Sequence, residues 1–468
     1  MSTLTTQYVQ KKIFRIVSET ARERGVRAFA IGGYVRDCFL GREGNDIDIV
    51  VEGSGIDFAC AVGEKCKAHV TVFKNFGTAM LHFEGDEIEF VGARKESYRR
   101  ESRNPIVENG TIEDDQLRRD FTINAMAFSL QEEDFGALVD PFGGIKDLAA
   151  GVIRTPLDPD TTYSDDPLRM LRAVRFATRL STPEHPFSIV PESIESMRRM
   201  APRMEILSKE RIAEELNKML LCNQPSKAFY LMDEAGLLPI ILPWIDALKG
   251  VENIDGHGHK DIFAHSLAVL DNVAAVSDNL WLRWAALLHD VGKSVVKKYE
   301  PGTGWTFRGH DVVGSKMVPR IFSALKLPLD EKLKYVKKLV WLHMRPIALV
   351  DDEVTDSAVR RLLFDAGNDI DDLMTLCNAD ITSRNPVKVA KIKANFELVK
   401  RKLVEVEEKD ALRNFKNPIS GDYIMEVFGI EPCNTIGQIK EVVKEAILEG
   451  EIGNNFEEAD ALMRKTAA

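Results

Sequence analysis

Long apolar runs are the first feature that this sequence lacks. No segment of its 468 residues approaches the length of a membrane-spanning helix. The start of the chain has neither the continuous apolar core nor the small-residue cleavage site of a signal peptide. Its six cysteines lie scattered, without the spacing of a metal site or of paired disulfides. We therefore expect a cytoplasmic protein with no membrane contact, whose cysteines are buried, reduced thiols.

A positive charge excess is also missing. The chain has 62 Lys and Arg against 73 Asp and Glu, a net charge of −11, which excludes coating of nucleic acid through bulk charge. Local basic surfaces are still present. One cluster holds Arg94, Lys95, Arg99, Arg100 and Arg103, and a second holds Arg384, Lys388, Lys391, Lys393, Lys400, Arg401 and Lys402. Solvated helix faces explain such clusters as well, so they favour nucleic-acid binding only together with other motifs.

The chain is too long for a single core, and its patterning changes along its length. A helix is expected over residues 4–24. Short β-rich runs follow at Ala28–Ile31, Ile47–Val51, His69–Phe73, Ala79–Phe83 and Ile88–Val91. From Asp166 onward helical periodicity dominates, as in Leu168–Leu180, Ile194–Met200, Lys209–Leu221, Ser226–Ala235, Asp261–Val276 and Leu280–Leu288. The patterning predicts an α+β protein: a head with a small mixed sheet (1–157), a helical connector (158–250), an all-α module (251–385) and a helical tail (386–468).

The head contains a glycine pair followed by alternating carboxylates. Gly32 and Gly33 follow an apolar run and let the backbone approach an anion at a helix start. Asp46 and Asp48 alternate with β-branched residues, so both carboxylates point to one face of a strand. Two acids on one face repel each other unless a cation lies between them, and beside a phosphate-binding turn that cation is expected to be Mg²⁺.

A later segment places an acid and three arginines at helical spacing. Asp166 precedes Pro167 and can cap a helix on which Arg169, Arg172 and Arg175 share one face. A carboxylate beside a guanidinium offers one acceptor and one donor. Cytosine and adenine present the complementary amino donor and ring-nitrogen acceptor, and uracil and guanine present the reverse. A capped helix with a basic stripe is the purely structural alternative.

Together these segments resemble the polymerase-β-like nucleotidyltransferases, in the class II form of tRNA nucleotidyltransferases (CCA-adding enzymes) and bacterial poly(A) polymerases. The resemblance rests on GGYVRDCFLG with NDIDIVV, then on RRDFTINA, DPFGGIKDL and DDPLRMLRAVRF. It spans roughly residues 25–225 and implies that 1–157 is a nucleotidyltransferase head and 158–250 a nucleotide-selecting, RNA-binding connector. The DPFGGIKDL turn would be the hinge between them. The acid before Asp166 is Asp165, where the family usually has Glu, a mild departure.

The resemblance also implies the roles of single residues. Asp46 and Asp48 would be catalytic and hold two Mg²⁺ ions, with Glu89 as a third candidate carboxylate. Asp166 and Arg169 would read the base, Arg172 and Arg175 would hold the triphosphate, and Arg119 and Asp120 would bind triphosphate and ribose hydroxyls. The full expected nucleotide-binding set is Gly32, Gly33, Arg36, Arg119, Asp120, Asn124, Asp166, Arg169, Arg172 and Arg175.

The second module carries histidines and aspartates in the order H…HD…H…H…D. They are His265, His289, Asp290, His310, His343 and Asp380. Adjacent His-Asp on an apolar helix is hard to explain by packing, because both side chains would need buried partners. The order resembles the HD superfamily of metal-dependent phosphohydrolases, which makes 251–385 an HD domain.

The HD resemblance implies a divalent metal, whether Mg²⁺, Mn²⁺ or a transition metal. Its ligands would be His265, His289, Asp290 and Asp380, and the second-site candidates are His310, His343 and Lys293. An HD fold with a lapsed site is the alternative. His257 and His259, in a Gly-rich turn, are interpreted as loop residues.

The sequence therefore predicts an enzyme that adds C and A to the 3′ end of tRNA from CTP and ATP without a template. An HD phosphohydrolase activity, for example on 2′,3′-cyclic phosphates, is a possible second function. Addition of only CC or only A, and poly(A) synthesis, are alternatives within the class. The alternative of another class is an HD phosphohydrolase with an RNA-binding head. The tail (386–468) is an RNA-binding candidate, and the oligomeric state is left open.

Overall fold

The computed structural model describes residues 5–42, 44–97, 106–254, 257–258, 261–351, 355–382, 386–410 and 412–466. The chain divides into two compact units. The first holds Met1–Met219 and Lys227–Leu242, and the second holds Leu220–Ser226 and Pro243–Ala468. This division is coarser than the four parts expected from the sequence, whose boundaries stay a prediction.

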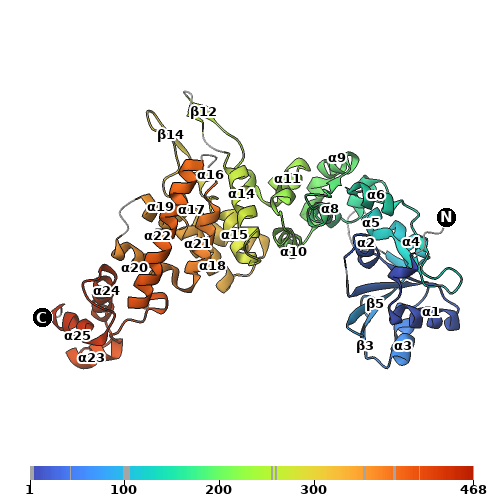
Figure 1. Cartoon of the computed structure of the whole chain (residues 1–468), viewed down its shortest axis with the longest axis horizontal. Coiled ribbons are helices and arrows are strands. Elements are labelled where there is room, and N and C mark those ends of the chain that lie inside the picture. The colour runs from blue at the N-terminus through green and yellow to red at the C-terminus, as the bar shows by residue number, and fades with distance from the viewer. Residues whose placement is uncertain are drawn as a thin grey trace. The chain divides into compact units, whose positions relative to one another are not determined.

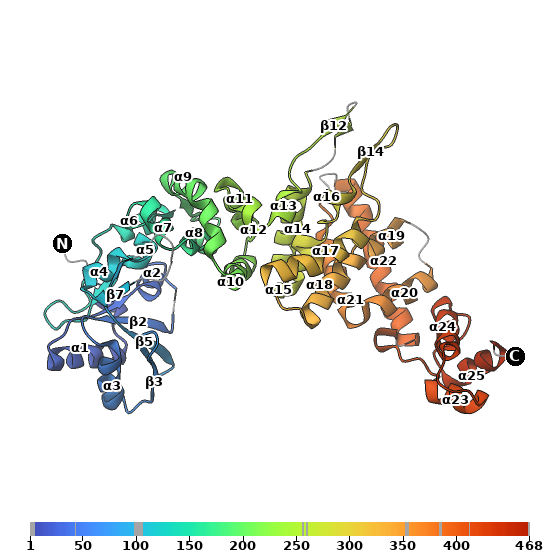
Figure 2. The same cartoon turned by 180° about the vertical axis from the view of Figure 1, so that it is seen from behind.

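A seven-stranded mixed sheet forms the centre of the first unit. Its order is β3-β4-β5-β2-β1-β8-β9, in which only the pair β2–β5 is parallel. The strands are β1 Ala28–Ile31, β2 Asp46–Val51, β3 Val70–Phe73, β4 Thr78–Phe83, β5 Asp86–Gly92, β8 Ala127–Ser129 and β9 Leu138–Val139. Helices α1, α2 and α3 pack against this sheet (Figures 1 and 2). Phe39 of α2 contacts Phe128 of β8, and Phe58 of α3 contacts Phe90 of β5; both aromatic residues of the sheet lie on the same face as Ile49, so α2 and α3 cover one side.

Helices of the first unit reach 13 residues both in the head (α1) and in the connector (α8). They are η1 Thr6–Tyr8, α1 Lys12–Arg24, α2 Gly33–Phe39, α3 Gly55–Cys66, α4 Ile112–Leu117, α5 Thr122–Ala125, α6 Gly144–Ala150, α7 Pro159–Asp165, α8 Leu168–Leu180, α9 Pro191–Met200, η2 Ala201–Ile206, α10 Lys209–Leu220, α11 Ser226–Glu234 and α12 Leu238–Ile241. Two small pairings complete the unit: β6 Arg94–Ser97 with β7 Ile106–Asn109, and β10 Val152–Ile153 with β11 Ser188–Ile189.

The second unit is helical apart from two hairpins. Its elements are α13 Pro243–Asp246, β12 Asn253–Ile254, β13 His257–Gly258, α14 Ile262–Ala274, α15 Leu280–Leu288, α16 Lys293–Val296, β14 Lys298–Glu300, β15 Gly304–Thr306, α17 His310–Leu325, α18 Glu331–Leu342, α19 Met344–Asp351, α20 Asp356–Ala366, η3 Gly367–Asp369, α21 Ile370–Ala379, α22 Pro386–Asp410, η4 Leu412–Asn414, α23 Gly421–Phe428, α24 Asn434–Glu449 and α25 Phe456–Thr466. Helices α14, α15, α17, α18 and α21 pack together, and both hairpins project from them (Figure 2).

The burial pattern of β2 explains how the head displays its acids. Ile47 and Ile49 are fully buried, whereas Asp46 is exposed and Asp48 partly buried. The period-2 prediction for this strand is therefore confirmed, because one face packs into the core and the other carries both carboxylates. Among the described residues, none of the helices is both long and apolar enough to cross a lipid bilayer.

Several expectations from the sequence need correction. The first long helix begins at Lys12 rather than at residue 4, and a 3₁₀ turn precedes it. Two hairpins interrupt the helical second unit, and His257 lies in a strand. All six cysteines are free, but only Cys222 and Cys377 are buried. His259, Arg99, Arg100, Arg103 and Arg384 lie outside the described residues.

Candidate active sites of the head and of the HD region

The carboxylates of the head form a short strip on two parallel strands. In the register of β2 and β5, Glu89 stands directly opposite Asp48. Burial raises the pKa of Asp48 to about 6; Arg119 opposes this shift, and the negative charges of Asp46 and Glu89 add to it. The strip is a place where carboxylates repel one another, so it fits a divalent cation with oxygen ligands.

The turn between β1 and α2 lies next to this acidic strip. Gly32 has a φ of +82° and stands at the start of α2. A Cβ at this position would lie 2.9 Å from Nη1 of Arg119 and 3.3 Å from Oδ2 of Asp48. Only glycine fits, both because of the backbone conformation and because of the close approach. The turn therefore brings its backbone to the carboxylates and to an arginine.

Asp120 is the centre of a buried network beside the strip. Its carboxylate accepts hydrogen bonds from Arg172 Nη2 at 2.6 Å and from Asn124 Nδ2 at 3.0 Å, and Asn124 in turn accepts from Arg36 at 2.7 Å. Burial alone would raise the pKa of Asp120, but Arg172 and Asn124 outweigh it and hold the pKa low. Asp120 stays ionised and orients Arg172.

An arginine-rich cavity of about 270 Å³ adjoins this network. Its lining residues are mostly cationic, and they are Arg118, Arg119, Asp120, Asp166, Leu168, Arg169, Arg172 and Arg211. Five guanidinium groups in one cavity suit a polyanion such as a triphosphate. Asp166 accepts a hydrogen bond from the backbone N–H of Leu168 at 3.1 Å, and Arg169 Nη2 donates to the carbonyl of Arg118 at 2.7 Å. The start of α8 thus fixes Asp166 and Arg169 in the cavity wall.

Arg175 has a different environment from the other two arginines of α8. Its Nε donates to Oε2 of Glu215 at 2.6 Å, and both side chains are buried. Its guanidinium lies 4.4 Å from the centroid of the Phe176 ring. Arg175 is absent from the cavity lining, so its visible role is to join α8 to α10.

In the second unit, the side chains of the H…HD…H…H…D series converge on Asp290. His265 Nε2 lies 2.8 Å from Asp380 Oδ1 and 3.5 Å from Asp290 Oδ2. The other carboxylate oxygen of Asp290, Oδ1, lies 3.3 Å from His310 Nε2 and 3.8 Å from His343 Nε2. Two groups able to hold a metal share Asp290: His265 with His289, and His310 with His343.

The second ring nitrogen of each histidine is already engaged. Nδ1 of His289, His310 and His343 lies 2.7–2.8 Å from a backbone carbonyl, to which it can only donate. This hydrogen bond turns Nε2 of each ring toward the centre of the site, where it can bind a metal through its lone pair. Nε2 of His289 is buried without a hydrogen-bond partner among the described residues. Such an orphaned atom fits a metal ligand.

Charge in this site also suits a cation. Burial would raise the pKa of Asp290, but His289, His310 and Lys293 outweigh it and hold the pKa far below its usual range. Burial lowers the pKa of His343 to about 4, which keeps its ring neutral. An ionised carboxylate beside the neutral imidazole of His343 is a donor set for a divalent metal.

Gly292 allows the histidines to meet. A Cβ on Gly292 would lie 2.1 Å from the carbonyl oxygen of His310, so the turn after Asp290 touches the start of α17. Lys293, which follows, lies 2.6 Å from Asp290 Oδ2.

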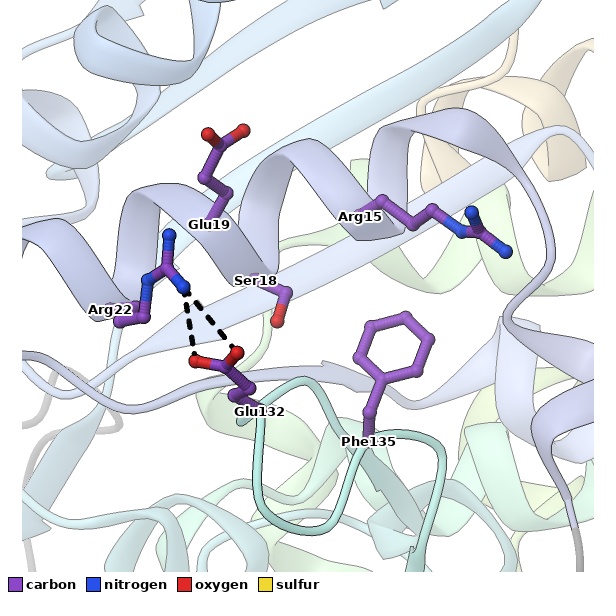
Figure 3. Close-up of a pocket in the computed structure, with 6 residues that line it drawn as sticks. All are labelled: Arg15, Ser18, Glu19, Arg22, Glu132 and Phe135. Atoms are coloured by element: carbon purple, nitrogen blue, oxygen red, sulfur yellow. Dashed lines mark hydrogen bonds and ion pairs between the residues drawn. The ribbon is translucent and has the colours of Figure 1, made fainter.

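A further hollow of about 330 Å³ lies against α1 in the first unit. Figure 3 shows Arg22 reaching toward Glu132, with which it forms an ion pair at 3.2 Å, while Phe135 lies on the same side of the helix. The lining contains none of the expected site residues.

Comparisons with known proteins agree with this geometry. A family model described as "Poly A polymerase head domain" matches residues 28–154, and one described as "Probable RNA and SrmB- binding site of polymerase A" matches residues 186–249. A third, "HD domain", matches residues 262–385. The multifunctional CCA protein of Cupriavidus metallidurans is 34% identical over 323 residues, which cover 65% of this chain and 72% of that protein. The chain belongs to the tRNA nucleotidyltransferase/poly(A) polymerase family.

Two further matches describe the breadth of this family. The A-adding tRNA nucleotidyltransferase of Deinococcus radiodurans is 32% identical over 366 residues, covering 76% of this chain and 80% of that protein. A crystal structure of a tRNA nucleotidyltransferase complexed with a primer tRNA and an incoming ATP analog matches with a TM-score of 0.57 and 25% identity, over 82% of this chain and 98% of that one. The predicted family and fold class, an α+β head followed by a helical HD region, are confirmed.

Nucleotidyltransferase heads and HD domains typically use divalent metals. The family matches therefore support the expectation of a divalent metal in the head and of another in the HD region. Within the first unit, the structure gathers Arg119, Asp120, Asp166, Arg169 and Arg172 around one cavity. Gly32 lies beside it, whereas Arg36 and Asn124 lie behind it in the network of Asp120. Their individual roles stay predictions.

Two cavity residues were missed at the sequence level. Arg118 lies directly before Arg119, which was predicted to bind the triphosphate. This adjacency is the sequence signal that could have pointed to Arg118 as a cavity residue. Arg211 lies on α10, outside every motif used, and no spacing rule connects it to the head. It reaches the cavity because side chains of α10 and α8 meet, as the buried Arg175–Glu215 ion pair shows.

Proposed function

We propose that the chain adds C and A nucleotides to the 3′ end of tRNA from CTP and ATP without a template, and releases pyrophosphate. The observation that carries this proposal is the acidic strip of Asp46, Asp48 and Glu89 beside an arginine-lined cavity. Strip and cavity are bridged by Arg119, which approaches Asp48 and lines the cavity.

The residues divide the work by position. Asp46 and Asp48 would hold two Mg²⁺ ions, which when bound lower the pKa of the RNA 3′-hydroxyl and stabilise the leaving pyrophosphate. Arg119 and Arg172 bind the triphosphate oxygens. Gly32 and Gly33, which lack a side chain, let their backbone approach the triphosphate closely. Asp120 is a positioning residue, because its carboxylate is committed to Arg172 and Asn124.

Base selection rests on the start of α8. Asp166 accepts from the amino group of C or A, and Arg169 donates to the neighbouring ring nitrogen. Both side chains are held by backbone contacts, so the donor and acceptor keep their places without a template strand. U and G present the reverse pattern and would leave both groups unpaired.

The decisive experiment uses purified protein, tRNA lacking its 3′ end, and each labelled NTP in turn. CTP and ATP should be incorporated and UTP and GTP rejected, and Asp46→Ala/Asp48→Ala should abolish incorporation. Arg169→Ala should lower kcat/KM for CTP and ATP by about 10²-fold, the loss expected for an unpaired recognition group. Wild-type incorporation of UTP or GTP comparable with CTP would refute the assignment of Asp166 and Arg169.

The same assay separates the alternatives within the family. Incorporation of ATP only on tRNA that already ends in CC would identify an A-adding enzyme, the activity named for the Deinococcus radiodurans relative. Incorporation of CTP only would identify a CC-adding enzyme, and repeated ATP addition a poly(A) polymerase. The tail is proposed to contact tRNA phosphates through exposed cations of α22, such as Lys391 and Lys393. A cytoplasmic location stays a prediction.

A phosphohydrolase activity of the HD region is a second candidate function. Its support is the convergence of four imidazoles on the ionised Asp290. The residues fit a divalent metal, which when bound would supply a hydroxide nucleophile for a phosphoester such as a 2′,3′-cyclic phosphate. His289→Ala should abolish hydrolysis of 2′,3′-cyclic AMP and spare CTP incorporation. If hydrolysis survived His289→Ala but vanished with Asp46→Ala/Asp48→Ala, this assignment would be wrong.

A further inference from the structure

A basic cavity with an aromatic wall lies between α17 and α18 in the second unit. Its volume is about 460 Å³, within the range of ligand-binding cavities. The lining is Val312, Ser315, Lys316, Lys334, Lys337, Lys338 and Trp341, four cations without an acid. In a chain with a net charge of −11, such a local excess of positive charge points to a ligand of its own.

The spacing of these residues shows how two helices build the cavity. Four lining residues come from α18. Counted from Lys334, the other three follow three, four and seven positions later, as Lys337, Lys338 and Trp341, so all four occupy one helix face. That spacing is typical of an apolar stripe buried against a core, whereas here three of the four residues are lysines. The facing helix contributes Val312 from its first turns. The cavity wall therefore combines apolar and cationic side chains.

The lysines differ in how far they are already neutralised. Lys338 pairs with Asp369 at 2.7 Å, and Lys334 pairs with Glu331 at 2.7 Å on the surface. Lys316 and Lys337 are exposed and have no ion-pair partner among the described residues. Two ammonium groups are thus free to meet an anion.

Trp341 is held in place independently of any ligand. The guanidinium of Arg345 stacks 4.3 Å from the centroid of the Trp341 ring, and Arg345 is itself paired with Asp365. A fixed indole in a cationic cavity is the combination with which proteins bind single-stranded nucleic acid: phosphates meet lysines and a base stacks on the ring.

We propose that this cavity binds a single-stranded segment of RNA, with a base against Trp341 and phosphates on Lys316 and Lys337. His310 begins α17 and His343 caps the end of α18, and they lie two residues along the chain from Val312 and Trp341. A strand bound here lies on the helices that form the HD centre. The cavity is a binding surface for RNA in the second unit, and it shares no residue with the nucleotide cavity of the first unit.

The test measures binding of a fluorescent, short oligoadenylate to the full chain without NTPs, over a series of salt concentrations. Lys316→Glu/Lys337→Glu should weaken binding at least tenfold. It should also make the salt dependence shallower by about 1.4, because each of the two phosphates that the lysines neutralise accounts for ~0.7 of the slope. The matched control Lys74→Glu/Lys298→Glu changes net charge equally at exposed lysines outside the cavity and should bind almost as the wild type does.

Two further measurements sharpen the result. Trp341→Ala should weaken binding about tenfold and Trp341→Phe should retain most of it, since stacking needs an aromatic face. An RNA duplex of the same length should bind equally to the wild type and to Lys316→Glu/Lys337→Glu. Equal affinity and salt dependence of the wild type and that double variant for oligoadenylate would overturn the proposal, and so would an equal loss in the control. The choice of RNA as the ligand rests on the proposed function. Because the binding assay contains no NTPs, loss of oligoadenylate binding can be told apart from loss of nucleotide incorporation.

Discussion

Arg175 and Glu215 show how a predicted site residue can have a structural role. Their side chains are 7% and 5% exposed and lie 2.6 Å apart, so neither reaches solvent. The repeat of arginines at three-residue steps predicted that Arg175 shares a face with Arg169 and Arg172. Whether a guanidinium on that face meets a nucleotide or a glutamate depends on α10, which lies about forty residues later in the chain and gives no local signal.

Removal of one partner of this pair should be costly. Glu215→Ala leaves Arg175 buried without a counter-charge, and we expect the free energy of unfolding of the first unit to fall by about 3–5 kcal/mol. Replacement of both, as Arg175→Met/Glu215→Leu, should recover most of that loss. Urea unfolding measures both changes. On the same helix, Glu214→Ala breaks only the exposed pair with Lys218 and should cost less than ~0.5 kcal/mol. Similar losses for Glu214→Ala and Glu215→Ala would contradict this account.

Asp115 gives the head a dependence on pH. Burial would raise the pKa of its carboxyl, but Arg119 and Arg118 outweigh burial and lower the pKa. A lowered pKa means that the folded state favours the ionised form. The stabilisation is therefore present above the unfolded pKa of about 3.9 and is lost as pH falls through the folded value.

Asp115→Asn tests this sign directly. At pH 7 the variant should lose about 1–3 kcal/mol of unfolding free energy, because two arginines lose their charged acceptor. The difference from the wild type should shrink as the pH falls below 4. Urea midpoints at pH 7, 5 and 3.5 measure it, and a difference that grows toward acid would show that the shift has the opposite sign.

At the scale of elements, local sequence patterns predicted the bounds of several helices and strands correctly, but they did not predict which elements lie beside one another. The strand Ala28–Ile31 and the helices Leu168–Leu180 and Leu280–Leu288 were predicted with the bounds that the structure gives. Apolar periodicity fixes such elements because each buries one face. The opposition of Glu89 to Asp48 depends on the parallel pairing of β2 with β5, and no local pattern encodes that pairing.

Two glycines with positive φ, one before and one after α2, offer a matched pair. Gly32→Ala would strain a φ of +82° and place a methyl group against Arg119 and Asp48, whereas Gly41→Ala would strain a φ of +65° with nothing within 4 Å. Both variants should lose about 1 kcal/mol or more of stability from backbone strain. Only Gly32→Ala should lose nucleotide incorporation, by at least about tenfold through displaced charges. Thermal melting and CTP incorporation measure the two effects, and equal activity of both variants would refute a role for the close approach.

At the scale of the whole molecule, the chain carries its two candidate metal centres in different compact units. The acidic strip of the head uses carboxylates from two strands, and the HD centre uses imidazoles and carboxylates at helix ends. Oxygen ligands favour Mg²⁺ and imidazoles favour transition metals, so the two centres should differ in the ion they prefer. A ligand that binds only the folded form of one unit stabilises that unit alone.

Calorimetry of the metal-free protein should therefore resolve the units by their response to metal. Mn²⁺ at about 100 times its Kd for the HD centre should add ~2.7 kcal/mol to the second unit, a rise of about 5–10 °C in its Tm. His289→Ala/Asp290→Ala should abolish that rise, and Asp46→Ala/Asp48→Ala should leave it intact because those carboxylates belong to the other unit. If Asp46→Ala/Asp48→Ala removed the rise, the ion that stabilises the fold would sit in the head, and the imidazoles around Asp290 would have to be explained as a hydrogen-bonded core.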